Sequence, residues 1–437
     1  MNELFVSMNG LRVGTLSKLQ SGALRFVYAE EWLRSRSARS LSLSLPLTHR
    51  PYEGDVVYNF LDNLLPDNEA IRAKMQARFH TSTTQPFDLL AAVGRDCVGA
   101  IQLSSEFEPG LSELKAKPLN EGQVAELLKG YASSPLGMQE AEEDFRISIA
   151  GAQEKTALLN MDGNWYLPQG STPTTHILKL PIGVLAHHNL DLSQSCENEW
   201  LCMHIAEAFG LPVAKTEVLT FEDQKVLSVE RFDRKWLDGQ RCVRLPQEDM
   251  CQALGVAPAL KYESDGGPGI KSIMQVLRGS KNAQADRATF FKAQILFWLL
   301  AAPDGHGKNF SLFIEPNNGY RLAPLYDIIS AYPLMGGTGL QKQKVKMAMW
   351  LHGQNRHFKW DEMMPRHFIS TAKAAGYSET LAFAHLEEML GKAYEVVESV
   401  QRTLPKRFPA DISQPIFDGL INKTEAGLRY LESASGK

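Results

Sequence analysis

The spacing of hydrophobic residues changes near residue 250, and this change restricts the fold more than any other feature of the chain. Between about residues 145 and 250 the apolar positions favour strands, as in "KTALLNM", "THILKLPI", "KTEVLTF" and "KVLSVERF". Beyond residue 250 they recur mostly at three and four positions, the spacing of amphipathic helices, as in "FFKAQILFWLL". Strand-rich and helix-rich parts that follow one another predict an α+β fold.

The first part of the chain is predicted to be a separate unit of strands and helices. Asn9-Gly10 lies between two alternating segments and suits the positive φ angles of a type I′ hairpin turn. "RSLSLSLPL" (39–47) alternates Ser and Leu, so we expect a strand that Pro46 ends. Helical spacing follows at 56–79 and 86–93, and the polar stretch 104–120 is typical of a long connection.

The middle part is predicted to be a small sheet with one helix. Asp162-Gly163 indicates a second hairpin, and "SCENEWLCMHIAEAFGL" has helical spacing that Gly210 ends. We therefore divide the chain into domains 1–139, 140–250 and 251–437.

Composition restricts the class of protein. The 437 residues are 44% hydrophobic, and a net charge of −4 means that any nucleic-acid binding would need a local patch or a partner. The five cysteines show no zinc spacing, which favours a reducing compartment. The longest apolar run, Ile295 to Ala302, is far short of the roughly 20 residues of a membrane span, and no leader pattern opens the sequence, so we expect a cytoplasmic protein.

The segment "AAPDGHGKNFSLF" (301–313) carries the strongest functional signal. Asn309 follows Asp304 by five positions, as in the catalytic loop of protein kinases, where a carboxylate faces the attacking hydroxyl and an amide oxygen ligates magnesium. Asp327 returns after a hairpin-like segment as a second magnesium ligand. A single loop aspartate more often caps a turn, but the spacing of the trio favours catalysis.

A kinase site also needs a phosphate loop and a cation. "SIAGAQEKT" (148–156) places Gly151 between two alanines, so backbone N–H groups could approach phosphates, although the segment is not a Walker A motif and resembles an ordinary hairpin. Lys179 lies on an apolar strand, where Glu197 or Glu199 on the following helix could pair with it. The alternative is an edge strand with Lys179 facing solvent.

Two further observations concern the nucleotide and the histidines. The stretch from Glu230 to Phe232 leads from the sheet toward the helical part, where it could offer backbone groups and a packing ring to adenine. His306 could orient Asp304 or the phosphates, whereas the adjacent His187 and His188 cannot easily point at one metal.

Several motifs in their order resemble the HipA toxin kinases of bacterial toxin–antitoxin pairs, and the similarity covers nearly the whole chain. They are "LSLSLPL", "FLDNLLPD", "PFDLLAAVGRDCVGA", "FRISIAGAQEKTALL", "TTHILKLPIG", "VERFDR", "LPQEDMCQALG", "KYESDGGPG", "DGHGKNFS" and "LYDIIS". The resemblance implies a two-lobed protein-kinase-like fold with an extra N-terminal α/β subdomain (1–139), an N-lobe (140–250) and an all-helical C-terminal lobe (251–437). It also implies a helix-turn-helix antitoxin, HipB, as partner, and operator DNA bound through the HipA–HipB complex.

The resemblance assigns roles to individual residues. Asp304 would be the catalytic base, Asn309 and Asp327 would hold Mg²⁺, and Ser148 would be an autophosphorylation site that silences the kinase. The ATP site would comprise Ala150, Gly151, Ala152, Gln153, Glu154, Lys155, Lys179, Glu230, Arg231, Phe232, His306, Gly307, Lys308, Asn309, Tyr326 and Asp327.

The resemblance also implies a cellular role. The family substrate is glutamyl-tRNA synthetase, whose phosphorylation by a serine/threonine kinase arrests translation and growth and promotes persistence. One departure from the family is Pro303, where relatives often carry a small residue, and a proline there could pre-set the loop or shift Asp304.

Two other functions are compatible with the sequence. The chain could be a pseudokinase that acts mainly as a HipB-bound co-repressor of its own operon, although its complete set of catalytic residues disfavours that as the sole role. A metal hydrolase that uses Asp304, His306 and Asp327 is the weaker alternative, because no further histidine has ligand spacing.

Overall fold

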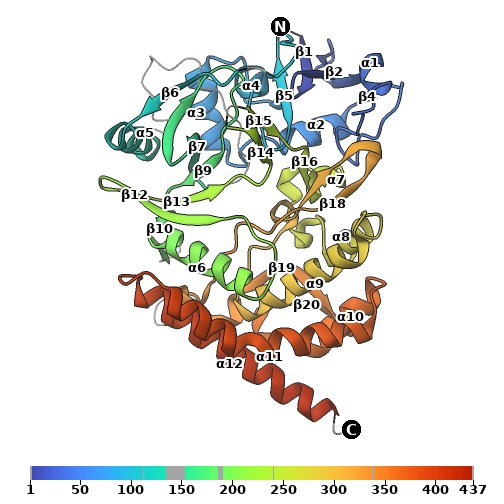
Figure 1. The fold of residues 1–437 in the computed structure, drawn as a ribbon. Coiled ribbons are helices and arrows are strands. Elements are labelled where there is room, and N and C mark those ends of the chain that lie inside the picture. Colours follow the sequence, from blue (N-terminus) through green and yellow to red (C-terminus); the bar gives the residue numbers. More distant parts are fainter. Residues whose placement is uncertain are drawn as a thin grey trace. The chain divides into compact units, whose positions relative to one another are not determined.

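The computed structural model describes residues 2–111, 113–133, 153–185, 190–239, 241–336 and 339–435 (Figure 1). Internal contacts divide the chain into two compact units. The first unit comprises Met1–Leu180, Leu219–Leu260 and Ser311–Tyr320, and the second comprises Pro181–Val218, Lys261–Phe310 and Arg321–Lys437. The expected domain borders near residues 139 and 250 stay a prediction.

An antiparallel sheet opens the first unit. Its strands are β1 (Glu3–Met8), β2 (Leu11–Lys18), β3 (Leu24–Tyr28), β4 (Tyr52–Glu53) and β5 (Ile101–Ser104), in the order β4-β3-β2-β1-β5. Asn9 and Gly10 join β1 to β2 with φ angles of 49° and 74°, so the expected hairpin is confirmed. Local backbone chemistry alone was enough to predict this turn.

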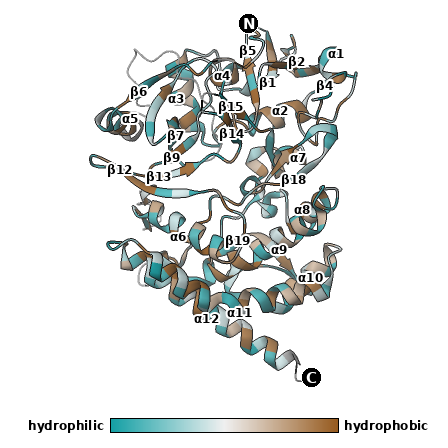
Figure 2. Cartoon of the chain, in the orientation of Figure 1, coloured by the Kyte–Doolittle hydropathy of each residue, from teal (hydrophilic) through white to brown (hydrophobic). Residues whose placement is uncertain are grey.

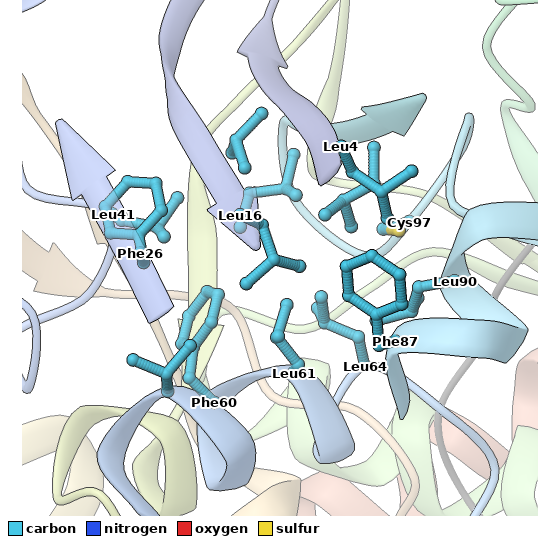
Figure 3. Packing of buried hydrophobic residues seen from close by; sticks show 14 of the residues in the cluster. Leu4, Leu16, Phe26, Leu41, Phe60, Leu61, Leu64, Phe87, Leu90 and Cys97 are labelled. Atoms are coloured by element: carbon cyan, nitrogen blue, oxygen red, sulfur yellow. The ribbon is translucent and has the colours of Figure 1, made fainter. Parts of the chain in front are cut away.

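Short helices supply the other side of this core. They are α1 (Glu30–Leu33), α2 (Asp55–Asp62), α3 (Glu69–Phe79) and α4 (Pro86–Val93), which confirms the helical spacing in 56–79 and 86–93. Figure 3 shows Leu4 and Leu16 from the strands meeting Phe60 and Leu61 from α2 and Phe87 from α4. Burial of these side chains holds the helices on the sheet.

The segment 39–47 is not a strand, so that prediction is wrong. Ser42 and Ser44 donate their side-chain hydroxyls to the backbone oxygen of Gln252, at 3.2 and 2.7 Å, and Leu41 and Leu45 are buried. Serine hydroxyls that bind the backbone compete with sheet pairing, and here they hold the segment in an irregular path.

A six-stranded sheet follows. It contains β6 (Ala116–Leu119), β7 (Lys155–Met161), β8 (Asn164–Pro168), β9 (His176–Lys179), β12 (Thr216–Phe221) and β13 (Gln224–Glu230), in the order β12-β13-β9-β7-β8-β6. The hairpin at Asp162-Gly163 is confirmed, with φ angles of 51° and 83°. The prediction that 104–120 is a connection is only partly correct, because β6 within it pairs with β8. Pro118 lies on this strand, which is at the edge of the sheet, where proline is tolerated.

The rest of the first unit consists of short elements. They are α5 (Glu121–Ser133), β14 (Arg234–Asp238), β15 (Arg241–Arg244), β16 (Gln247–Asp249), α7 (Met250–Ala253) and β17 (Ser311–Ile314), which pairs with β16. Gln252 caps the start of α7 with Asp249 and donates its side-chain amide to the oxygen of Phe60 at 3.1 Å. The motif "LPQEDMCQALG" therefore ties α7 to the N-terminal helices and to segment 39–47.

The second unit is mainly helical. Its helices are α6 (Ser195–Ala208), α8 (Ile270–Leu277), α9 (Ala283–Leu299), α10 (Pro365–Ala374), α11 (Glu379–Thr403) and α12 (Ala410–Ser435). Figure 2 shows hydrophilic and hydrophobic residues alternating along α11, which buries Leu386, Met389 and Leu390 among others. Gly210 follows α6 with φ 82°, as its sequence position predicted.

Residues 251–437 are not all-helical, and this detail of the expected fold is corrected. β17, β18 (Tyr320–Leu322), β19 (Lys346–His352) and β20 (Arg356–Lys359) lie within them, while β10 (Gly183–Leu185) and β11 (Leu190–Leu192) pair near the start of the second unit. β19 pairs with β20 and buries two consecutive residues, Ala348 and Met349, so its side chains do not follow the regular alternation that would have marked it as a strand in the sequence. Within the described residues, no helix combines the length and apolar character needed to cross a membrane.

Candidate active site

The loop that is predicted to be catalytic begins where α9 ends. Ala301 adopts a left-handed φ of 47°, and Ala302 donates its N–H back to the oxygen of Phe297 at 2.8 Å, so the chain turns sharply out of the helix. Gly305 lies against the ring of Phe297, where a Cβ atom would overlap the ring. Only glycine fits this approach, which explains its place directly after Asp304.

The side chain of Asp304 is exposed at the turn of this loop. Tyr262 donates its hydroxyl to Asp304 Oδ1 at 2.6 Å, and the N–H of His306 bonds the backbone oxygen of Asp304 at 2.8 Å. The ring of His306 is buried and meets the ring of Tyr262 edge to face, with centroids 5.1 Å apart. His306 therefore lies within the loop that presents Asp304, whereas Tyr262 escaped the sequence analysis.

Asn309 and Asp327 come together. Asn309 is 3% exposed on a 3-10 turn, Gly307–Asn309, and donates its side-chain Nδ2 to the backbone oxygen of Asp327 at 3.2 Å. Tyr326 donates its hydroxyl to the oxygen of Lys308 at 2.6 Å, which adds a second bond between the loop and this segment. Asp327 has a left-handed φ of 62°, an unusual conformation for a residue other than glycine.

The donor set suits a hard divalent cation. Since Nδ2 of Asn309 is used on Asp327, the amide oxygen is turned away from that bond, and no described residue donates to it. An amide oxygen and a carboxylate are ligands that Mg²⁺ accepts together with phosphate oxygens and water. Asn309 and Asp327 therefore fit the magnesium-binding role predicted for them.

Helix α6 is hydrogen-bonded to Ser330, three residues after Asp327. Asn198 donates Nδ2 to the oxygen of Ser330 at 2.8 Å and accepts the N–H of Ser330 on Oδ1, also at 2.8 Å. The hydroxyl of Ser330 donates to the oxygen of Leu300, at the end of α9, at 2.6 Å. Asn198 and Ser330 were not singled out in the sequence, and they anchor the segment that carries Asp327.

The predicted cation Lys179 is buried. It is 7% exposed on β9, which lies between β13 and β7, so the alternative of an edge strand facing solvent is wrong. Glu197 and Glu199 are buried on α6, at 4% and 2% exposure. Lys179 belongs to the first unit and the two glutamates to the second, and their pairing stays a prediction.

Much of the predicted phosphate loop lies outside the described residues. Ser148, Ala150, Gly151 and Ala152 fall there, as do His187 and His188. Gln153 donates its side-chain amide to the oxygen of Leu180 at 2.5 Å, the oxygen of Glu154 accepts the N–H of Leu180 at 3.3 Å, and Lys155 starts β7.

Two residues of the predicted adenine-binding stretch 230–232 make structural contacts within the first unit. The N–H of Arg231 donates to the oxygen of Thr175 at 2.8 Å, and Phe232 packs edge to face on Phe313 with centroids 5.7 Å apart. The Arg231 side chain is buried and binds Asp233 at 2.8 Å. Arg231 is thus held inside the first unit, while Glu230 at the end of β13 is exposed.

Arg231 is buried because it belongs to a cluster of buried charged side chains. Asp96 accepts hydrogen bonds from Arg234 at 2.9 Å and Arg244 at 2.7 Å and lies 3.5 Å from Arg231. Although burial favours the neutral acid, Arg234, Arg244 and Arg231 hold the pKa of Asp96 well below its usual value. The motifs "GRDC" and "VERFDR" therefore meet in one structural ion cluster, which their separate positions in the sequence did not reveal.

The metal-hydrolase alternative receives no support from the geometry. Across the described ranges, no three or more His, Cys, Asp and Glu side chains are grouped so that they could hold a metal ion, and this includes Asp304, His306 and Asp327. The loop instead exposes the carboxylate of Asp304 and, through Asn309, binds the backbone oxygen of Asp327.

Comparisons with known proteins show the family of the chain. The model of the HipA-like C-terminal domain matches residues 147–399, and that of the HipA N-terminal domain matches residues 4–104. The protein Y4mE of Sinorhizobium fredii is 34% identical over 406 residues, which cover 91% of each chain. The serine/threonine-protein kinase toxin HipA of Shewanella oneidensis is 29% identical over 344 residues, 75% of each chain.

A solved structure shows the same fold. The complex of the Shewanella oneidensis toxin–antitoxin system HipA, HipB and its operator DNA contains a chain that matches with a TM-score of 0.82, at 24% identity and 98% coverage of both chains. The α+β fold class expected from the sequence is confirmed. Because the C-terminal family model alone spans residues 147–399, the chain belongs to the HipA-like family.

Proposed function

We propose that this protein is an ATP- and magnesium-dependent serine/threonine protein kinase and the toxin of a type II toxin–antitoxin pair. The observation that carries the proposal is the bond from Asn309 Nδ2 to the oxygen of Asp327, on the same loop that exposes Asp304. A base and two magnesium ligands on two adjoining segments are the parts that phosphoryl transfer requires.

The chemistry follows from these positions. Asp304 would accept the proton of the substrate hydroxyl as that oxygen bonds to the γ-phosphorus of ATP, while the bond from this phosphorus to the bridging oxygen of the β-phosphate breaks and ADP leaves. Asn309 and Asp327 would hold Mg²⁺, which would supply positive charge to neutralise the phosphates. Catalysis then rests on positioning and electrostatic stabilisation rather than on a covalent intermediate.

Regulation is proposed to act through Ser148. A phosphate there adds about −1.5 to −2 charge beside the loop from Ala150 to Lys155 and repels the phosphates of ATP. Autophosphorylation at Ser148 would thus inactivate the kinase.

The partners are proposed by analogy with the family. HipB would bind the protein, and the complex would bind operator DNA and co-repress the operon. The cellular substrate would be glutamyl-tRNA synthetase, with arrest of translation and persistence as the result. The name of the Shewanella oneidensis relative and the solved HipA–HipB–DNA complex support the proposed binding of HipB and operator DNA.

The experiment is intact-mass spectrometry after incubation with ATP and Mg²⁺. We expect a gain of one phosphate, lost in Ser148→Ala and in Asp304→Gln. An Asp304→Gln protein that gains phosphate as fast as wild type would refute the assignment of the base. Circular dichroism of the variants would verify that both remain folded.

The alternative function is a pseudokinase that acts mainly as a HipB-bound co-repressor. It predicts no phosphate gain under any condition, but operator binding with HipB in a gel-shift assay. The exposed carboxylate and the joined Asn309 and Asp327 favour the active kinase.

A further inference from the structure

The segment "KYESDGGPG" (261–269) has no role in the proposed function, yet it contacts the catalytic loop directly. The N–H of Gly307 donates to the oxygen of Lys261 at 3.1 Å. The ring of Tyr262 packs edge to face on His306, and its hydroxyl bonds Asp304 Oδ1 at 2.6 Å. Three contacts from two consecutive residues bind this segment to the loop.

The hydroxyl of Tyr262 engages one oxygen of the Asp304 carboxylate. A length of 2.6 Å is typical of a charge-assisted O–H···O⁻ bond, the stronger class of hydrogen bond. In the described part of the chain, no bond reaches the other oxygen, Oδ2. An aspartate side chain rotates easily about its last bond, so fixing Oδ1 sets the direction of Oδ2.

Tyr262 is itself held firmly. Its backbone oxygen accepts the N–H groups of Asp265 at 3.1 Å and Gly267 at 3.0 Å, which closes a tight turn. The next residue, Glu263, is buried and accepts the N–H of Trp350, on β19, at 2.9 Å. The exposed carboxylate of Asp304 is thus bound by the hydroxyl of Tyr262, which lies on a hydrogen-bonded turn.

The loop that contains Asp304, the acceptor of the Tyr262 hydroxyl, is also bonded to β19. Ala348, also on β19, donates its N–H to the oxygen of Pro303 at 2.8 Å, one residue before the base. β19 therefore forms hydrogen bonds both to the turn that contains Tyr262 and to the loop that contains Asp304. Pro303 has no N–H to donate, but its oxygen is a fixed point of the loop.

We propose that Tyr262 is a positioning residue that holds Asp304 so that Oδ2 faces the substrate hydroxyl. This inference rests on the proposed kinase function. Tyr262 acts through Asp304 and transfers no proton itself. Removing its hydroxyl leaves the base in place but free to rotate, so the productive geometry is reached less often.

The experiment measures single-turnover autophosphorylation with γ-labelled ATP and Mg²⁺, as a function of ATP concentration. Tyr262→Phe should lower the maximal rate by about 10- to 100-fold. The half-saturating ATP concentration and the melting temperature should stay at the wild-type values. In an Asp304→Ala background, Tyr262→Phe should cause no further loss of any residual rate, because the side-chain oxygen that its hydroxyl binds is already gone.

Tyr377→Phe is the matched control. Tyr377 also makes a single side-chain hydroxyl bond in the second unit, to His385 at 2.9 Å. Its ring lies against Phe291, His385 and Arg287. This variant should react at the wild-type rate. It separates loss of a hydroxyl in general from loss of the bond to Asp304.

The outcomes distinguish the two proposals. A wild-type protein that transfers no phosphate overturns both the kinase proposal and the role of Tyr262. An active wild type with an equally active Tyr262→Phe overturns the role of Tyr262 alone. A Tyr262→Phe protein that loses rate only through weaker ATP binding or a lower melting temperature also overturns it, since that is the result of a purely structural role.

Discussion

The carboxyl group of Glu263 lies directly against Gly269, in the space that a methyl group on Gly269 would occupy. Glu263 cannot easily move aside, because it is 8% exposed and binds the N–H of Trp350. Gly269→Ala should therefore destabilise the protein by about 1–3 kcal/mol through overpacking. Thermal unfolding followed by circular dichroism would measure the change.

The control for this substitution is Gly391→Ala. Gly391 is exposed within α11, and nothing lies within 4 Å of the added Cβ. Alanine is the better helix former, so this variant should gain roughly 0.5–1 kcal/mol. Equal losses in the two variants would contradict the packing argument.

Glu248 should make stability depend on pH. Burial raises its pKa from 4.5 to about 8, against the hydrogen bond from the N–H of Leu43. The folded state holds this proton more tightly than the unfolded chain, so the contribution of Glu248 to stability is greatest below pH 4.5 and is lost as the pH rises through about 8. Glu248→Gln removes the ionisation and should be more stable than wild type at pH 9 by about 1–3 kcal/mol. Urea unfolding at several pH values would show it, and parallel stability curves for the two proteins would disprove it.

Asp96 should be among the most sensitive positions in the first unit. Asp96→Asn removes the charge that Arg231, Arg234 and Arg244 share, and Asp233 alone is left to balance the buried cations of this cluster. We expect a loss of about 3–5 kcal/mol in the free energy of unfolding. Asp238→Asn breaks an exposed ion pair with Arg241 and should change stability by less than about 1 kcal/mol. Comparable losses at both positions would mean that the buried cluster has no special weight.

Asn198 should control the order of the segment that carries Asp327. Asn198→Ala leaves the N–H and oxygen of Ser330 without their partner, which costs about 1–3 kcal/mol for each buried group left unsatisfied. Hydrogen exchange followed by mass spectrometry should show faster exchange in the peptide around Ser330. Asn355→Ala, in an exposed turn, is the control and should leave that peptide unchanged.

Local chemistry made part of the fold predictable. Asn9-Gly10 and Asp162-Gly163 adopt the positive φ angles that their residue types favour, and Gly210 follows α6 as its position indicated. The spacing of Asp304 and Asn309 was informative because both residues lie in one short, continuous loop, whereas Asp327 lies on a separate segment beyond β17 and β18. In each case the sequence carried the physical reason within a few residues.

Contacts between distant residues could not be predicted in this way. Tyr262 and Asp304 are 42 positions apart, and Asn198 and Ser330 are 132 apart. Segment 39–47 alternates like a strand, yet the oxygen of Gln252 binds its serine hydroxyls and prevents pairing. A single sequence shows the residue types in such contacts but not which of them meet.

The anchoring of Ser330 limits how the chain can be divided. Ser330 is bonded to Asn198 on α6 and to Leu300 at the end of α9, so three distant stretches complete one another's backbone hydrogen bonds. A fragment that starts at residue 251 lacks α6 and would bury two unsatisfied groups beside Asp327. For split-protein reporters or separately expressed halves, a break between α6 and α9 would therefore require the fragments to reassemble before the site exists.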